Sequence, residues 1–163
     1  MSIAIFQKLI TLFDAGNAHY RVLEHEPVCT SEEAAQVRGT TLGQGAKAMV
    51  CRMRVSSSRH VYVLAVFPGD QRVDFNKIAA AVNGKKAALA TPEEVEKLTD
   101  CVMGAVPPVS FHPELRLIVD PSLLRRNQKI SFNAGLRERS IIINSADYQR
   151  IVAPCCITII KEE

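Results

Sequence analysis

The chain has 163 residues, of which 47% are hydrophobic and 23% charged, and its formal net charge is +3. This length suits one domain with a real core, and the composition excludes a disordered chain, a collagen-like chain and a coiled coil. So small a net charge predicts neither a nucleic-acid binder nor a protein for acidic ligands. The distribution of charge along the chain says more about a partner than the total does.

The apolar and cysteine patterns favour a cytoplasmic protein. Lys8 interrupts the apolar start of the chain, which lacks the basic leader and cleavage site of a signal peptide. No apolar stretch approaches the roughly 20 residues that a membrane helix needs. The five cysteines include the adjacent pair Cys155 and Cys156, and none forms a CxxC motif. Reduced thiols in the cytoplasm, and no membrane contact, are expected.

The first half of the chain predicts helices and strands in alternation. Apolar residues three and four apart, N-cap residues before acidic first turns, and β-branched runs bounded by turn residues are the signals. In chain order they predict a helix over 3–13, a strand over 20–25, a helix over 31–38, a loop over 40–45, and a hairpin of strands 46–55 and 59–67 with its turn at 56–58.

The second half predicts shorter elements of both kinds. They are helices over 75–82 and 91–98, an extended segment over 101–109, strands over 115–119, 129–133 and 140–143, a helix over 145–152 and a terminal strand over 157–160. Short helices and many strands without a regular βαβ alternation favour an α+β fold. We expect a single domain over 1–163, with a central mixed, mostly antiparallel sheet flanked by short helices.

The sequence motifs typical of common cofactor sites and catalytic sets are absent or stand in the wrong structural context. The run from Gly43 to Ala48 matches G-x-G-x-x-A, but it follows a predicted helix and opens a predicted strand, the reverse of a dinucleotide site. The four histidines lack metal-ligand spacing, and G-x-S-x-G is absent. The sequence therefore predicts neither a metal ion nor a cofactor.

Lys47 is a candidate functional residue because it stands where a glycine-rich loop becomes an apolar strand. A lysine there can project into a cleft, where its ammonium can hold a phosphate or orient an ester carbonyl. The alternative is a solvated lysine on a sheet edge.

The segment from Gly104 to Pro108 predicts a rigid loop with few side chains. Because proline lacks an N–H, its donors are concentrated at Gly104, Ala105 and Val106, where they can face an oxyanion or ester oxygen. A tight strand connection is the alternative. The turn Asn133-Ala134-Gly135 can likewise let a ligand approach the backbone, or serve only as a turn.

Taken in order, these pieces resemble the YbaK and prolyl-tRNA-synthetase-associated editing-domain family over nearly the whole chain. The matching segments are Tyr20-Arg21-Val22, His25-Glu26-Pro27, Thr30 to Ala35, Gly45 to Ala48, Gly104 to Pro108, Phe132 to Gly135 and Ser145 to Tyr148. Residues 39–47 and 109–113 are most similar to a free-standing subgroup associated with clearing serine and threonine from mischarged tRNA.

The resemblance implies an aminoacyl-tRNA deacylase that acts in trans on the acceptor end of tRNA, with a synthetase as a further partner. It implies Lys47 as the main functional side chain, backbone contacts from Gly104 and Ala105, and assistance from the terminal hydroxyl of the tRNA. The expected substrate-binding residues are Tyr20, His25, Thr30, Pro107, Pro108, Asn133, Ala134, Gly135 and Ser140.

The residue expected to differ from several relatives is Ser140. Those relatives, notably the cysteine-clearing type, carry an acid there, so a carboxylate role cannot be transferred to this chain. A pocket for small polar amino acids must exclude larger ones and satisfy a hydroxyl. Thr30, Asn133 and Ser140 are candidate polar liners, and the small Ala134 keeps space open.

Two rival functions stay open. One is a non-catalytic module that binds tRNA or a synthetase on the same fold, and the other is a thiol redox protein that uses Cys155 and Cys156.

The charge distribution favours a nucleic-acid partner. Residues 34–69 contain no acid, and residues 116–139 hold six bases against two acids. Both stretches flank the candidate site, which indicates a tRNA-facing side whose binding weakens as salt rises. Ordinary solvated arginines are the alternative.

Overall fold

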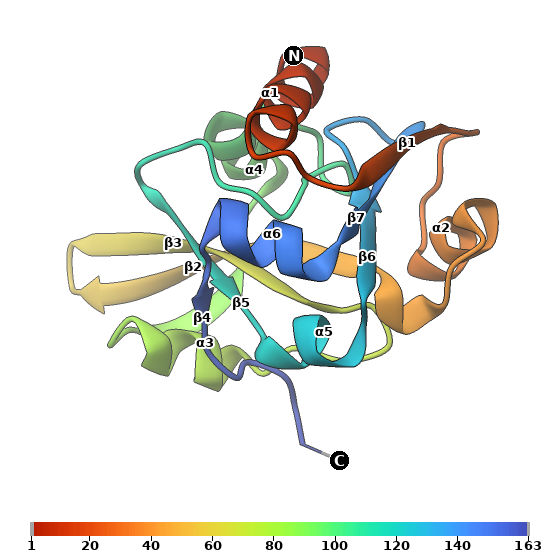
Figure 1. Cartoon of the computed structure of the whole chain (residues 1–163). Helices are drawn as coiled ribbons and strands as arrows, with labels where there is room; N and C mark the ends of the chain where they lie inside the picture. Colours follow the sequence, from red (N-terminus) through yellow and green to blue (C-terminus); the bar gives the residue numbers. More distant parts are fainter. Residues whose placement is uncertain (1, 163) are drawn as a thin grey trace.

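A computed structural model describes residues 2–162 of the chain (Figure 1). Its elements in chain order are α1 (Ser2–Ala15), β1 (Tyr20–Glu24), α2 (Ser31–Arg38), the 3-10 turn η1 (Leu42–Gln44), β2 (Ala46–Ser56), β3 (Arg59–Pro68), α3 (Phe75–Ala81), β4 (Lys85–Leu89), α4 (Pro92–Thr99), β5 (Leu115–Val119), α5 (Pro121–Arg126), β6 (Lys129–Asn133), β7 (Arg139–Asn144), α6 (Ser145–Val152) and β8 (Cys155–Cys156).

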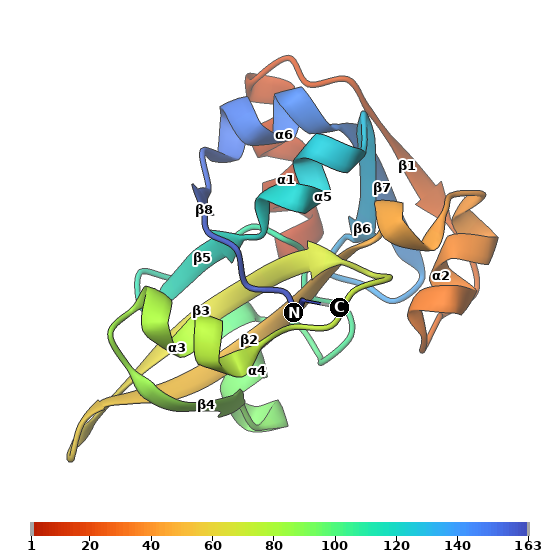
Figure 2. The same ribbon diagram turned by 90° about the horizontal axis from the view of Figure 1, so that it is seen from below.

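The larger sheet has five strands in the order β4-β2-β3-β5-β8. β2 and β3 form a long antiparallel hairpin, and β4 pairs antiparallel with β2. β3 and β5 are parallel, as are β5 and β8. Figure 2 shows the hairpin extending past the helices at one end of the molecule.

The smaller sheet is antiparallel, with strand order β1-β7-β6. Asn133 on β6 lies opposite Ser140 on β7, close to the turn that joins these strands. A parallel bridge between Gly45, just before β2, and Ser131 on β6 connects the two sheets. The end of β6 and the start of β2 are thereby held side by side, which positions the site described below.

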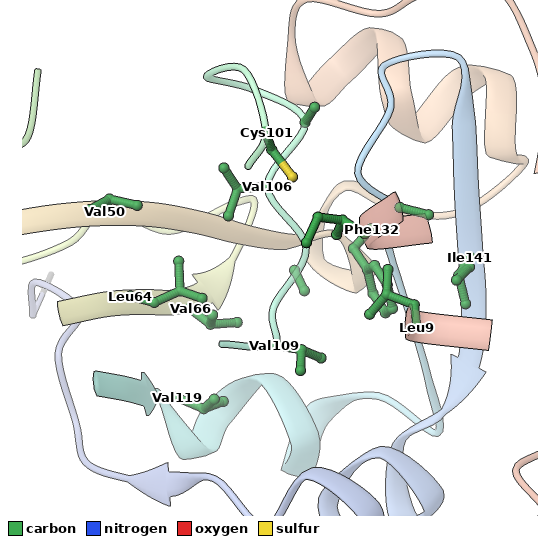
Figure 3. Packing of buried hydrophobic residues seen from close by; sticks show 14 of the residues in the cluster. Leu9, Val50, Leu64, Val66, Cys101, Val106, Val109, Val119, Phe132 and Ile141 are labelled. Carbon is green, nitrogen blue, oxygen red and sulfur yellow. The ribbon is translucent and has the colours of Figure 1, made fainter. Parts of the chain in front are cut away.

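Apolar residues fill both faces of the larger sheet because side chains alternate along each strand. From β3, Leu64 and Val66 join the core between the two sheets, together with Phe132 of β6 and Leu9 of α1 (Figure 3). Alternate β3 residues pack instead into a second cluster that includes Ile78 of α3. β3 is therefore buried on both faces.

Local capping explains where several helices begin and end. Thr91 and Glu94 form a reciprocal capping box at the start of α4, with a proline at its first position. Thr30 caps α2 through a hydrogen bond from the Glu33 N–H. Gly39 ends α2 with φ +69°, a left-handed conformation that suits glycine.

The α+β class is confirmed, with the strands divided between two sheets. Two elements lie outside the predictions: β4, whose sequence Lys-Lys-Ala-Ala-Leu lacks β-branched residues, and α5, which starts at Pro121 after the N-cap Asp120. The terminal strand predicted over 157–160 is wrong: the strand is Cys155–Cys156, and Ile160 forms only an isolated bridge with Val73. Within residues 2–162, no helix is long and apolar enough to cross a membrane.

Candidate active site

A cavity of about 520 Å³ opens where the two sheets meet. One wall is the start of β2, a second is α2 with the segment before it, and a third is the loop between α4 and β5. Its lining residues are Val28, Cys29, Thr30, Ser31, Glu32, Ala34, Ala35, Arg38, Leu42, Gly45 to Val50, Gly69, Leu89, Val95, Met103, Gly104, Val106 and Asn133.

Lys47 lies in this cavity on the first part of β2, and its side chain is exposed. β4 pairs with β2 only from Cys51 onward, so the β2 edge beside Lys47 is left open to the cavity. Among residues 2–162 no carboxylate lies within ion-pair distance of the Lys47 ammonium. The cavity therefore holds an uncompensated cation, which favours an anionic or carbonyl ligand.

Of the N–H donors expected in the Gly104 loop, one has no acceptor and another is hydrogen-bonded within the loop. Gly104 has φ +92°, and its N–H has no acceptor among the described residues. The Ala105 N–H donates to the carbonyl of Val102 over 3.0 Å. The expectation that Ala105 offers a free donor is thus wrong, because this N–H closes a turn within the loop itself.

A hydrogen-bond network around Arg38 connects the cavity wall to the smaller sheet. The Arg38 side chain donates to Ser140 Oγ (2.8 Å), Asn133 Oδ1 (2.8 Å) and Ser131 Oγ (3.4 Å). The Asn133 amide in turn donates from Nδ2 to the Gly104 carbonyl over 2.6 Å. Arg38 and Asn133 thereby fix the position of the Gly104 loop.

The charge of Arg38 is unusual because it is buried without a carboxylate. The residue is only 8% exposed, and within residues 2–162 its partners are hydroxyl and amide oxygens. Burial lowers the pKa of Arg38 to about 10, so the guanidinium remains charged at neutral pH. The site thus contains a second cation, largely buried in the cavity wall.

His25 completes this network on the side away from the cavity. Its Nδ1 lies 2.7 Å from the carbonyl of Glu26, and its Nε2 lies 2.8 Å from Ser140 Oγ. With Nδ1 as the donor to the carbonyl, Nε2 accepts from the Ser140 hydroxyl. Ser140 Oγ thus links Arg38 to His25.

The structure brings together four of the residues predicted for the site: Lys47, Gly104, Thr30 and Asn133 all line the cavity. The Thr30 hydroxyl is engaged at the start of α2, where it accepts from the Glu33 N–H and donates to the Glu33 carboxylate.

His25 and Ser140 lie outside the lining and contact it through Arg38.

The remaining predicted residues lie behind the cavity wall or away from it. Ala134 and Gly135 are buried, and Gly135 donates its N–H to the Ala105 carbonyl over 3.0 Å. Pro107 and Pro108 are buried too, and the Pro108 carbonyl accepts the Tyr148 hydroxyl.

Tyr20 faces α1, where its hydroxyl donates to Asp14 over 2.6 Å. Tyr20 lies outside the cavity lining, and its ring packs against Phe13.

Sequence reasoning missed Arg38 as a site residue, because a base in the last turn of a helix usually complements the helix dipole. It also missed the apolar Leu89 and Met103, which line the cavity although both are more than 40% exposed. Their positions depend on β4 and on the loop after α4, and no local sequence pattern marks them.

The two cysteines of the rival redox function lie away from the cavity. Cys155 and Cys156 are exposed on β8, at the edge of the larger sheet, and neither lines the cavity. In the part of the chain that the structure describes, no group of three or more His, Cys, Asp or Glu residues could hold a metal ion.

Comparison with known proteins assigns the fold and cavity to a class. The model of the aminoacyl-tRNA editing domain matches residues 25–151. This range includes the Arg38 network, Lys47 and the Gly104 loop. The chain therefore belongs to the aminoacyl-tRNA editing-domain family.

Individual relatives lie within the same family. The chain is 46% identical over 148 residues to the "Multifunctional Ser/Thr-tRNA deacylase ProXp-y" of Escherichia coli K12, covering 91% of this chain and 88% of the relative. It is 23% identical to the "Prolyl-tRNA editing protein ProX" of Acetoanaerobium sticklandii, over 90% of this chain and 89% of that protein. A crystal structure of a proposed trans-editing enzyme for prolyl-tRNA synthetase superposes with TM-score 0.79 at 25% identity, over 99% and 98% of the two chains.

Proposed function

We propose that residues 1–163 act as one editing domain that hydrolyses the ester of mischarged aminoacyl-tRNA in trans, and that it clears small amino acids such as serine, threonine or alanine. Family membership and the name of the Escherichia coli relative support this activity. The observation that carries it is the unpaired Lys47 ammonium in the same cavity as the free Gly104 N–H.

Charge stabilisation is the main catalytic contribution of the protein. When water attacks the ester carbonyl, negative charge develops on the carbonyl oxygen, and the bond between the carbonyl carbon and the ribose oxygen then breaks. The Lys47 ammonium and the Gly104 N–H are donors suited to that oxyanion. The products are a free amino acid and a tRNA with its terminal hydroxyl restored.

The lining explains why the tRNA itself can assist the reaction. No histidine is among the cavity-lining residues, so the wall has no nucleophile paired with an imidazole base. The terminal ribose hydroxyl that the family resemblance implicates can orient the water instead. The fold then contributes binding, orientation and charge rather than an acid–base pair.

The size and chemistry of the cavity suit an aminoacyl-adenosine end. A volume of about 520 Å³ lies within the range of small-molecule sites. The exposed apolar side chains of Leu89 and Met103 offer a surface for the adenine, and Asn133 offers a polar contact for a small amino acid.

The location and partners follow from this activity. The substrate is aminoacyl-tRNA, engaged at its acceptor end, and the compartment is the cytoplasm, where translation takes place. The five free cysteines fit such a reducing compartment. Association with a synthetase is supported by the likeness to a proposed trans-editing enzyme for prolyl-tRNA synthetase.

A deacylation panel tests the proposal. The purified chain is incubated with tRNAs charged with serine, threonine, alanine or cysteine, and ester loss is followed against a buffer control. Hydrolysis of at least one small aminoacyl-tRNA is expected. Tight tRNA binding with all four esters intact would instead establish the non-catalytic binding module and contradict the deacylase.

A further inference from the structure

The far end of the β2–β3 hairpin carries a concentration of cations that the active site does not use. We call it the basic hairpin patch; it consists of Arg52, Arg54, Arg59, Lys85 and Lys86. The strand register brings these residues together, since Arg54 lies opposite Lys85 on β4 and Ser56 lies opposite Arg59 on β3. Figures 1 and 2 show this end of the hairpin projecting beyond the helices.

A hollow of about 250 Å³ opens within this patch and adjoins the active-site cavity through the shared residue Leu89. Glu94 is the one acid among its lining residues, and it lies 3.7 Å from the Arg52 guanidinium. Arg54 and Lys86 also line the hollow, and neither has an ion-pair partner within residues 2–162. The hollow therefore has an excess of positive charge beside the active site.

Three features of the patch cost stability. Arg54 and Lys85 face each other across neighbouring strands, and like charges in that position are destabilising. Lys86 has φ +58°, a conformation rare for residues other than glycine. The Nε atom of Arg52 is buried without a hydrogen-bond partner. Costs concentrated in one place are typical of a binding surface.

We propose that the basic hairpin patch binds the phosphate backbone of the tRNA acceptor arm whose 3′ end occupies the active-site cavity. This inference rests on the proposed function. Arg52 and Arg54 follow Lys47 by five and seven residues on β2, which corresponds to about 17–24 Å along an extended strand. Phosphates upstream of the terminal adenosine lie within such a span, and arginine and lysine contact them without reading sequence.

The test reverses two charges of the patch and compares them with a matched pair elsewhere. Arg54→Glu/Lys86→Glu is compared with Arg125→Glu/Lys161→Glu, because Arg125 and Lys161 are exposed bases outside both hollows. For uncharged tRNA, the Kd of the patch variant should rise on the order of tenfold. The slope of log K against the logarithm of the salt concentration should become less negative by about 2. The control pair should bind close to the parent chain.

A neutral pair, Arg54→Gln/Lys86→Gln, gives the same test if charge reversal impairs folding. Removing Arg54 relieves its repulsion with Lys85, so the Tm of this pair should not fall. Equal loss of binding in the patch and control pairs, or an unchanged salt slope in the neutral pair, would overturn the inference.

A short substrate separates this inference from the proposed function. In the deacylation assay, the KM of the patch variant for full-length aminoacyl-tRNA should rise about tenfold, whereas that for a 3′-aminoacyl-adenosine should stay at the parent value. A parent chain that deacylates while its patch variant keeps the parental KM contradicts the inference alone. A parent chain that binds tRNA through the patch without hydrolysis contradicts the proposed function alone.

Discussion

Arg38 and Asn133 meet end to end in the cavity wall, with Arg38 Nη2 2.8 Å from Asn133 Oδ1. The opposite end of the same amide donates to the Gly104 carbonyl. Asn133 thus connects a buried cation to the loop that carries the Gly104 N–H. If the proposed function holds, Arg38 would be a positioning residue, because it contacts the Gly104 loop through Asn133.

Replacing Arg38 should reduce turnover more than substrate binding. Arg38→Met leaves Ser140 and Asn133 without their donor and releases the Gly104 loop, and a displacement of about 1 Å can lower a rate on the order of 100-fold. We expect that loss in kcat with KM little changed, and partial recovery in Arg38→Lys, whose ammonium keeps the charge without the planar fork. Steady-state deacylation kinetics measure both parameters. Arg125→Met, on the surface of α5, is the control, and equal kcat values in all three variants would exclude a positioning role.

Replacing Lys47 should reduce kcat strongly without unfolding the protein. Removal of one oxyanion donor lowers kcat by about 100- to 1000-fold. A substitution at an exposed side chain that has no ion-pair partner within residues 2–162 should change stability by less than about 0.5 kcal/mol. Single-turnover deacylation and urea unfolding of Lys47→Ala measure the two effects. A rate equal to that of the parent chain would remove Lys47 from the mechanism.

Gly104→Ala should affect activity through backbone conformation alone. The added methyl group would lie 3.6 Å from the nearest atom, an ordinary contact, but φ +92° disfavours any side chain. We expect a loss of about 1–3 kcal/mol in the free energy of unfolding and a lower kcat. Gly39→Ala is a matched comparison, with φ +69° and open space around it. Equal losses of stability in the two variants allow their kcat values to be compared. If Gly104→Ala then had a kcat equal to or higher than that of Gly39→Ala, a catalytic part for the Gly104 N–H would be excluded.

The stability of the fold should depend on ionised Asp120. Burial raises the pKa of Asp120, but hydrogen bonds from Ser122, Ile159 and Ile160 outweigh that effect and hold it below its usual 3.8. Because the folded pKa is lower than the unfolded pKa, the stabilisation is present above about pH 4 and is lost as the pH falls through the folded value.

Asp120→Asn should therefore lower the free energy of unfolding by about 1–3 kcal/mol at pH 7, and the difference from the parent chain should shrink at pH 3. Urea unfolding at both pH values measures it, and a pH-independent difference would refute the ionic origin.

Local signals in the sequence were sufficient for most of the fold. Several signals act within a few residues and can be recognised without tertiary structure. They are N-caps such as Thr91, the left-handed helix end at Gly39 and the alternating apolar strands. β4 is not predictable in this way, because Lys85 and its neighbours have weak strand propensity. They form a strand only because the edge of β2 offers them hydrogen bonds. The Asp120-Pro121 start of α5 is a capping signal that the sequence does contain.

The candidate site was only partly predictable for a similar reason. Lys47 and Gly104 stand out locally as a cation beside glycines and a glycine before prolines. Arg38 does not, because its role depends on Ser140 and Asn133, which lie 102 and 95 residues away along the chain. Ala105 was misjudged because the use of its N–H is decided by the turn to Val102, a geometric detail that composition does not specify.

The exposed thiol of Cys29 in the cavity wall gives the molecule a natural attachment point for a reporter. Burial raises the pKa of Cys51 to about 12 and that of Cys101 to about 11, so both resist alkylation at neutral pH. With Cys155 and Cys156 changed to serine, Cys29 is the one exposed thiol left. A fluorophore placed there would sense entry of the tRNA end directly, in real time and independently of ester cleavage.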